Sequence, residues 1–451
     1  MGGAYRTIWR WHFYAGLFVM PMVLILAATG SVYLFKPQVE RWEERAWQGL
    51  PTTGLVAPSV QRDAALAAFP GATFHSYRLP ERSGDAAMIH LAVPGGMRDV
   101  FVSPRGQVLG SLDPEARIMA WVRKIHGQLL LGQRGSWIVE LAASWAIVMI
   151  ATGLYLWWPR QSGLAGVLWP RTLRGRLFWR DLHAVTGFWV SAFAMVLLLT
   201  GLPWTGVWGP AFNAVRAEMG WVKGDKGWTT GGEAPAPAHA EHDHAAVAMG
   251  HVHMPSTVTM EAIVAQAEGE HLAFPVTVSP PGAPGPHGAK PDPNWTVRSE
   301  SPNRPLDVAI RYDANSGREV AREGFADKHP IDQVIGYGIA WHEGQLFGWV
   351  NQLVGVATAL ALMTLSVSGF VMWRRRRPAA GLGAPPRQWD KGRARSKALP
   401  VIVALGFVLL PLFALSIVAL WLFDRLVLPR LPGLARWLGA NSDASLRHGQ
   451  A

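Results

Sequence analysis

Cysteine is absent from the 451 residues of this chain. That absence excludes disulfide bonds, iron–sulfur clusters with cysteine ligands, C-x-x-C-H haem attachment and catalysis by a thiolate. Charged residues are also few, at 16% of the chain, whereas hydrophobic residues make up 50%. We infer that a redox metal in this chain must be held mainly by histidine, of which there are 15.

Long apolar runs are plentiful, and five of them are long enough to cross about 30 Å of hydrocarbon. The first run continues through Phe35 without a polar segment or a small-residue cleavage site, so we interpret it as an uncleaved anchor rather than a signal peptide. The five runs are His12–Lys36, Ser136–Trp158, His183–Trp208, Leu346–Trp373 and Leu399–Phe423.

Basic residues gather in two short connections between these runs. Pro159–Leu182 carries five arginines against one acid, and Arg374–Lys397 carries nine basic residues against one acid. The positive-inside rule predicts that both connections and the N-terminus are cytoplasmic, with the long connections 37–135 and 209–345 on the far side. We therefore attribute the net charge of +11 to topology and contact with anionic lipid, not to nucleic-acid binding.

The chain repeats itself. The first and third runs share the same interval between an early histidine and a later glycine, and the second and fourth runs share a longer one. Equal spacings in both pairs predict an internal duplication. The pairs are His12 and Gly30, His183 and Gly201, His126 and Gly153, and His342 and Gly369.

Each long connection predicts one short helix packed on a small antiparallel sheet. The first has a helix at Ser59–Phe69, and its strand-like runs include Thr73–Leu79 and Ala87–Val93. The second has a helix at Thr257–Glu268, and both end in a hairpin with the same pattern of residues. We place His75 and His90 at surface or hairpin positions of the first domain.

The fold class predicted is an α-helical membrane protein with two small α+β domains on the far side, built from a span–domain–span unit used twice plus a fifth helix. The expected segments are helix 1–36, domain 37–125, helix 126–158, loop 159–182, helix 183–208, domain 209–341 with a His-rich insert at 226–255, helix 342–373, loop 374–398, helix 399–428 and tail 429–451. The insert could bind Cu, Ni or Zn, or could be disordered with no defined site.

The span–domain–span unit and the histidines that head the spans resemble the PepSY-associated transmembrane proteins, the iron-regulated inner-membrane group that includes ferric-siderophore reductases. The resemblance covers residues 5–377. It implies b-type haem and electron transfer across the bacterial inner membrane to a ferric siderophore. Some relatives carry a fused flavin-reductase domain that this chain lacks, so the resemblance leaves the electron donor open, as a flavoprotein or another reduced carrier.

Four histidines are the candidate cofactor ligands. A duplication axis along the membrane normal would bring His12 opposite His183 at the inner face, and His126 opposite His342 at the outer face. Two imidazoles from facing helices can be the axial ligands of one haem, so we expect two b-type haems, each held by two histidines. The alternative is that each histidine is only a polar anchor at the membrane interface.

Neighbouring residues agree with a haem at each layer. Gly16 and Gly187 follow their histidines by four residues and so share the same helical face, leaving room for a flat ring. Cations lie near enough to meet haem propionates at each end. These are Arg10 and Arg180 inside, and Arg123 and Lys124 outside.

The function predicted is a haem-containing reductase that passes electrons from the cytoplasm to a ferric siderophore or other ferric chelate and releases Fe(II). No catalytic nucleophile, acid–base pair or separate metal site is expected. Two alternatives remain open: a transporter of iron, copper or siderophore without redox chemistry, and a non-catalytic regulatory or sensor protein. Glu140, early in the second run, could bind a proton or cation, or could pair with a neighbour such as Arg134.

Overall fold

The protein is described by a computed structural model that covers residues 3–158, 166, 168–221, 254–284, 291–385, 404–406 and 409–439. The chain forms two compact units. The helical unit contains Met1–Ser31, His126–Trp208 and Val356–Ala451. The sheet unit contains Val32–Ile125 and Gly209–Gly355. The His-rich insert at 226–255, except for its last two residues, lies outside the described part of the chain.

Among the described residues, five helices are long and apolar enough to cross a membrane. Four of them match the runs expected from the sequence, so the structure has helices suited to crossing a membrane at the first four predicted positions. The apolar stretches of the five helices are Tyr5–Tyr33, Gly132–Trp157, Leu177–Trp204, Trp349–Arg376 and Pro411–Arg430. They correspond to α1 (Gly3–Tyr33), α5 (Gly132–Trp157), α6 (Gly175–Gly201), α11 (Trp349–Arg376) and α13 (Pro411–Leu422) with the turns that follow it.

The fifth span is described in part. The sequence predicted a helix from Leu399; residues 399–403 and 407–408 lie outside the described part of the chain, and the continuous described helix begins at Pro411, with the span ending at Arg430. Proline has no backbone N–H and a fixed φ, so it is favoured in the first turn of a helix and disfavoured further inside. A short helix, α14 (Pro432–Trp437), follows.

Side chains of three helices of the helical unit, α1, α5 and α13, form one buried hydrophobic cluster. Ala15 and Val19 of α1 are buried in one cluster with Trp145 and Val148 of α5. Phe413 of α13 completes this cluster and is fully buried. A hydrophobic cluster of this kind joins three helices that are far apart in the sequence.

The strands of both long connections form one eight-stranded antiparallel sheet, not the two separate small sheets that the sequence predicted. Its order is β4-β3-β2-β1-β5-β6-β7-β8, and the two sets of four meet where β1 pairs with β5. The strands are β1 (Thr73–Arg78), β2 (Ala87–Val93), β3 (Gly96–Val102), β4 (Val108–Leu112), β5 (Val276–Ser279), β6 (Trp295–Ser299), β7 (Val308–Tyr312) and β8 (Glu319–Gly324). Local patterning predicted most of these strands but not β5, and it carried no signal for the pairing of β1 with β5.

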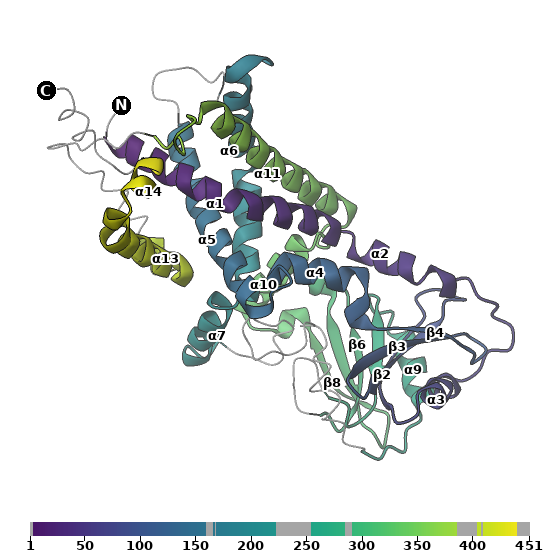
Figure 1. The fold of residues 1–451 in the computed structure, drawn as a ribbon. Helices are drawn as coiled ribbons and strands as arrows, with labels where there is room; N and C mark the ends of the chain where they lie inside the picture. The colour runs from purple at the N-terminus through teal and green to yellow at the C-terminus, as the bar shows by residue number, and fades with distance from the viewer. Residues whose placement is uncertain are drawn as a thin grey trace, which may run out of the picture. The chain divides into compact units, whose positions relative to one another are not determined.

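One face of the sheet is covered by α3 (Pro58–Ala68) and α9 (Met260–Gly269), close to their predicted positions (Figure 1). Ile89, Ile263 and Ile310 are completely buried in the core between these helices and the strands. Burial of each such side chain contributes about 1.5–3 kcal/mol. Because side chains alternate along a strand, the neighbours of Ile89, Met88 and His90, point to the other face.

Four helices connect the spans to the sheet. α2 (Lys36–Glu43) follows α1, and α7 (Trp208–Glu218) follows α6. α4 (Ile118–Gln128) leads into α5, and α10 (Pro330–His342) leads into α11. Each of the latter two carries a candidate histidine in its last turn. His126 lies in the last turn of α4, and His342 lies in the last turn of α10.

Candidate functional site

Three of the four candidate histidines lie in the helical unit. His12 is on α1, His183 is on α6, and His126 is near the end of α4. His12 and His183 lie close enough for their charges to repel each other if both rings were protonated. His342 is the last residue of α10 and belongs to the sheet unit.

Each of the three rings binds a hydroxyl of a neighbouring helix through its Nδ1 atom. His12 Nδ1 lies 3.0 Å from Thr152 Oγ1 on α5. The Nδ1 atom of His126 also lies 3.0 Å from a threonine hydroxyl, that of Thr29 on α1. His183 Nδ1 lies 3.1 Å from the Ser368 hydroxyl and 3.1 Å from the Leu365 carbonyl on α11.

The protons in these hydrogen bonds can be assigned from the other partners. Thr152 Oγ1 donates its only proton to the Val148 carbonyl, at 2.8 Å, and Thr29 Oγ1 donates to the Ile25 carbonyl, at 2.7 Å. A hydroxyl has one proton and two lone pairs, so each oxygen can then only accept from the imidazole. The carbonyl of Leu365 also can only accept from His183. We assign the proton of all three neutral rings to Nδ1, which leaves the lone pair on Nε2.

A glycine next to each hydroxyl residue lies against the same imidazole ring. A Cβ atom added to Gly30 would lie 3.1 Å from Cε1 of His126, and one added to Gly153 would lie 3.2 Å from Cε1 of His12. For Gly369 the equivalent distance to Cε1 of His183 is 3.5 Å. We call each hydroxyl residue and its following glycine a hydroxyl–glycine pair: Thr29-Gly30, Thr152-Gly153 and Ser368-Gly369.

His12 and His183 lie at the basic end of the helical unit. Arg376, at the end of α11, lies over the rings of Trp9 and Phe13 at 5.4 and 5.1 Å, and Phe13 is adjacent to His12 in sequence. Arg375 lies 5.7 Å from the ring of Trp179, which is four residues before His183. The two histidines therefore share one end of the bundle with the arginines that end α11.

His126 lies at the other end of α1. Its ring contacts Thr29 and Gly30, in the last turns of the helix that carries His12 near its beginning. A helix rises about 1.5 Å per residue, so these two histidine layers are about 25 Å apart along α1. This separation is close to the thickness of the hydrocarbon core.

The family with the description PepSY-associated TM region matches residues 9–376. The chain belongs to this family. The match spans the four histidines and the first four apolar helices, and it ends before the fifth. No curated protein was found to match the chain.

The cations that the sequence offered for haem propionates have local partners in this PepSY-associated protein. Arg10 binds Pro385 O, Arg180 pairs with Asp181, and Lys124 pairs with Glu115. Asp181 is fully buried and accepts three hydrogen bonds from Arg171, two to one oxygen and one to the other. These contacts give the cations a structural role that proximity in sequence could not reveal.

Glu140 binds backbone N–H groups rather than Arg134, the neighbour suggested for it. Its carboxylate is 1% exposed and accepts hydrogen bonds from the backbone N–H groups of Val207, at 2.8 Å, and Trp208, at 3.1 Å. A carboxylate is favoured at such a position because the first N–H groups of a helix have no partner within the helix. The side chain of Glu140 therefore stabilises the end of the third span and the start of α7.

The glutamines of the segment after His342 bind the end of the first span. The Leu34 carbonyl, just past the end of α1, accepts hydrogen bonds from Gln345 Nε2 at 3.1 Å and Gln352 Nε2 at 3.0 Å. A Cβ atom on Gly344 would lie 2.8 Å from the Leu34 side chain, and one on Gly355 would lie 2.6 Å from it. The segment needs both glycine and glutamine because it encloses a buried leucine and an otherwise unpaired carbonyl.

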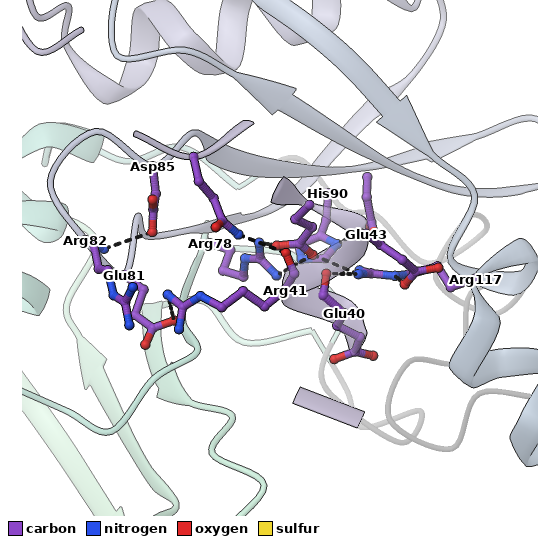
Figure 2. Close-up of polar contacts among 12 residues, drawn as sticks. Glu40, Arg41, Glu43, Arg78, Glu81, Arg82, Asp85, His90 and Arg117 are labelled. Atoms are coloured by element: carbon purple, nitrogen blue, oxygen red, sulfur yellow. Dashed lines mark hydrogen bonds and ion pairs between the residues drawn. The ribbon is translucent and has the colours of Figure 1, made fainter. Parts of the chain in front are cut away.

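His90 lies in the hairpin of β2 and β3, one of the two positions predicted for it, but it is buried and not on the surface. Its Nδ1 lies 2.8 Å from Asp99 on the neighbouring strand, and the two side chains are 9% and 4% exposed. Figure 2 shows His90 beside a set of charged residues that includes Arg78 and Arg117. The alternation of β2 gave no sign of burial because no element was predicted around Trp47, which packs on this face of the sheet.

Burial alone would raise the pKa of Asp99, but the ion pair with His90, reinforced by Arg117 and Arg78, outweighs it and lowers that pKa to about 2. The pKa of Glu44 is lowered as well, since its ion pairs with Arg78 and Arg117 outweigh the desolvation of its carboxylate. Arg78 Nη2 lies 2.6 Å from Glu44, and Arg117 Nη2 lies 2.9 Å from it. The set is therefore a charge network that stabilises the fold.

Sequence reasoning identified the histidines but missed the hydroxyl–glycine pairs. The signal was present, because Thr-Gly or Ser-Gly stands at the end of each of the four repeated histidine-to-glycine intervals. Their glycines had served only as markers of spacing. Among the described residues, no group of three or more His, Asp or Glu side chains is arranged to hold a bare metal ion.

Proposed function

We propose that this PepSY-associated protein binds haem through its four histidines and carries electrons across the bacterial inner membrane to a ferric siderophore or other ferric chelate. The observation that carries the proposal is that Nδ1 of both His12 and His183 is engaged by an acceptor on a neighbouring helix. Within the described part of the chain, neither Nε2 atom makes a hydrogen bond. Two neutral imidazoles with free Nε2 lone pairs are the donor set that a low-spin haem iron takes.

The residues of the chain would hold two haems in two layers. His12 and His183 would hold one at the basic end of the helical unit, which the positive-inside rule assigns to the cytoplasm. His126 and His342 would hold the other toward the far side, as the duplication predicts. Haem supplies a centre that accepts and gives up one electron at a time without a proton.

The chain's own side chains contribute binding and orientation, not bond making. The buried hydroxyls orient the imidazoles, the glycines let the rings lie against the neighbouring helix, and the apolar surroundings exclude water from the histidines. A one-electron donor, a flavoprotein or another reduced carrier, would meet the basic cytoplasmic end. The ferric chelate would accept the electron on the far side and release Fe(II), because hard oxygen ligands bind Fe(II) less tightly than Fe(III).

The visible spectrum of the full chain, purified in detergent and recorded oxidised and dithionite-reduced, tests the proposal. We expect a Soret band and sharp α and β bands on reduction. The His12→Ala or His183→Ala variant should lose the haem of the first layer, about half of the total. The His126→Ala or His342→Ala variant should lose the haem of the second layer, also about half of the total. A protein that stays colourless after expression with a haem precursor would contradict the proposal, and metal flux in liposomes without a reductant would then favour a transporter.

A further inference from the structure

We propose that the hydroxyls of Thr29, Thr152 and Ser368 are positioning residues that set the tautomer and basicity of the haem-ligand histidines and thereby lower the haem midpoint potential. The inference rests on the proposed function, because it concerns the same histidines. It goes further in assigning a role to side chains that would not themselves be iron ligands. It is carried by one arrangement that occurs three times on three different pairs of helices.

The arrangement has the same parts each time. A hydroxyl accepts from Nδ1, the carbonyl three residues earlier on the same helix also interacts with the ring, and the glycine one residue later lies against Cε1. The hydroxyl residues are Thr152 for His12, Thr29 for His126 and Ser368 for His183. The carbonyls are those of Met149, Leu26 and Leu365, in the same order. Such repetition is not expected of incidental packing.

The chemistry follows from where each hydroxyl sends its proton. Thr152 and Thr29 donate to the carbonyl four residues earlier, and Ser368 donates to the Leu365 carbonyl at 3.1 Å. The remaining lone pairs face the imidazole N–H, so the opposite tautomer would bring two acceptors together without a proton. The hydroxyl thus keeps Nε2 unprotonated and ready to bind a metal.

An acceptor on Nδ1–H also makes the imidazole a stronger donor through Nε2. Such outer partners fix the ring orientation and raise the basicity of a ligating histidine, and their loss commonly costs about 10–100-fold in metal affinity. A more basic ligand stabilises Fe(III) relative to Fe(II). Removal of the hydroxyl should therefore weaken haem binding and shift the midpoint potential to more positive values.

Valine is the matched replacement for threonine because it keeps the branched shape and removes the oxygen. In Thr152→Val, the His12 ring keeps the Met149 carbonyl but loses the hydroxyl. Thr364→Val is the matched control, since Thr364 lies on α11 and donates to the Leu360 carbonyl at 2.8 Å without contacting a histidine. Thr152→Ser keeps the oxygen and should restore the behaviour of the unaltered protein.

Gly153→Ala tests the same arrangement through the ring's position. The added methyl would lie 3.2 Å from Cε1 of His12, so the ring would have to move by a few tenths of an ångström. We expect this variant to weaken haem binding at the His12 layer without the loss of any hydrogen-bonding group. A weaker haem affinity in Gly153→Ala would be due to the position of the ring, whereas a change in Thr152→Val would be due to the lost hydrogen bond.

The duplication extends the inference to one more pair. Thr200-Gly201 follows His183 by the same interval as Thr29-Gly30 follows His12. The Thr200 hydroxyl donates to the Val196 carbonyl at 2.7 Å, as Thr29 does to Ile25. By sequence position, we expect Thr200→Val to change the haem spectrum and potential in the same direction as Thr29→Val.

The experiment is a redox titration of the full chain in detergent, with haem content and the potential of each haem read from the reduced α band, and with hemin affinity measured on the haem-depleted protein. We expect Thr152→Val to bind hemin about 10–100-fold more weakly at one site and to shift that potential positively. Thr364→Val and Thr152→Ser should be unchanged.

Two outcomes would count against the inference, and they differ. If the unaltered protein binds haem and Thr152→Val, Thr29→Val and Ser368→Ala all keep its affinity and potentials, the inference fails and the proposed function stands. If the unaltered protein binds no haem, the proposed function fails and the inference falls with it. A Thr152→Val protein that does not fold leaves Thr29→Val and Ser368→Ala to decide.

Discussion

The two connections between spans and sheet each contain an ion pair that joins two connecting helices, but the charges are arranged differently. In the first, acids at the end of α2, Glu43 and Glu44, pair with Arg117, the residue before α4. In the second, Arg216 near the end of α7 pairs with Asp332 in the first turn of α10. Each ion pair ties the helix that follows one span to the helix that leads to a candidate histidine, but the charges are exchanged.

The surroundings of the two pairs also differ. Arg216 and Asp332 are 2% and 1% exposed, and Arg216 Nη2 lies 2.7 Å from both carboxylate oxygens. Arg117 and its acids are 10–13% exposed and belong to the larger network with Arg78 and the His90–Asp99 pair (Figure 2). Both connections therefore have an ion pair at the corresponding point, but its charges are exchanged and its surroundings differ.

The largest effect is expected for breaking the second tie. Arg216→Met leaves the Asp332 carboxylate buried without its ion pair, which should destabilise the sheet unit by about 3–5 kcal/mol. Hydrogen exchange of the α10 backbone amides in the full detergent-purified chain should show the loss as faster opening.

The double variant Arg216→Met/Asp332→Leu is the control, because it removes both charges together. It should be clearly more stable than Arg216→Met alone. A double variant as unstable as the two single changes added together would show that the pair acts through something other than burial of an unpaired charge.

A smaller effect is expected for the first tie. Arg117→Met removes the partner of Glu43, but Arg78 still pairs with Glu44 at 2.6 Å, and the acids are closer to water. We expect a loss of about 2–3 kcal/mol, read from hydrogen exchange of the α4 amides. An equal loss in Arg117→Met and Arg216→Met would contradict this expectation. It would mean that the remaining charges around Glu43 and Glu44 do not reduce the cost of removing Arg117.

The pH dependence of the first tie provides a further test. The pKa of Asp99 is lowered to about 2 in the folded state, against an ordinary value of 3.8. A lowered pKa contributes stability above the unfolded value, and that contribution of about 2 kcal/mol is lost as pH falls from about 4 toward 2. Asp99→Asn should therefore be less stable than the unaltered chain at pH 6, by thermal unfolding, and the difference should shrink at pH 3.

Much of this architecture was accessible from the sequence, for identifiable physical reasons. Apolar length predicted five spans, of which four coincide with described helices along their length, and period-two patterning predicted strands such as Ala87–Val93, because hydrophobic periodicity is a local property. The pairing of β1 with β5 and the burial of His90 were not predicted, since both depend on residues far along the chain. Hydrophobic periodicity is read over a few neighbouring residues, so it carries no information on pairing between residues that are far apart in the sequence.

Some residues of the candidate site were likewise predictable from the sequence, and others were not. The duplicated spacings identified the histidines, whose pairing remains a prediction. The partner of Glu140 was missed because backbone N–H groups carry no sequence signal. Thr152 and Ser368 were missed because a hydroxyl inside an apolar helix is ordinarily satisfied by its own helix, and only the structure shows a second partner across the bundle.

The smallest effect is expected for an exposed ion pair on the same helix as the first tie. Arg41 of α2 lies 3.1 Å from Glu81, but the two side chains are 34% and 51% exposed (Figure 2). Water and salt screen such a pair, so Arg41→Met should change stability by no more than about 0.5 kcal/mol, in the same hydrogen-exchange measurement as Arg117→Met. Arg41 and Glu43 are close neighbours on α2, so both variants remove an ion pair of the same helix. A difference between Arg41→Met and Arg117→Met is therefore due to the burial of the pair and not to the helix that carries it. Equal losses would mean that α2 is held by its charges in general, and that the buried tie to Arg117 has no special place among them.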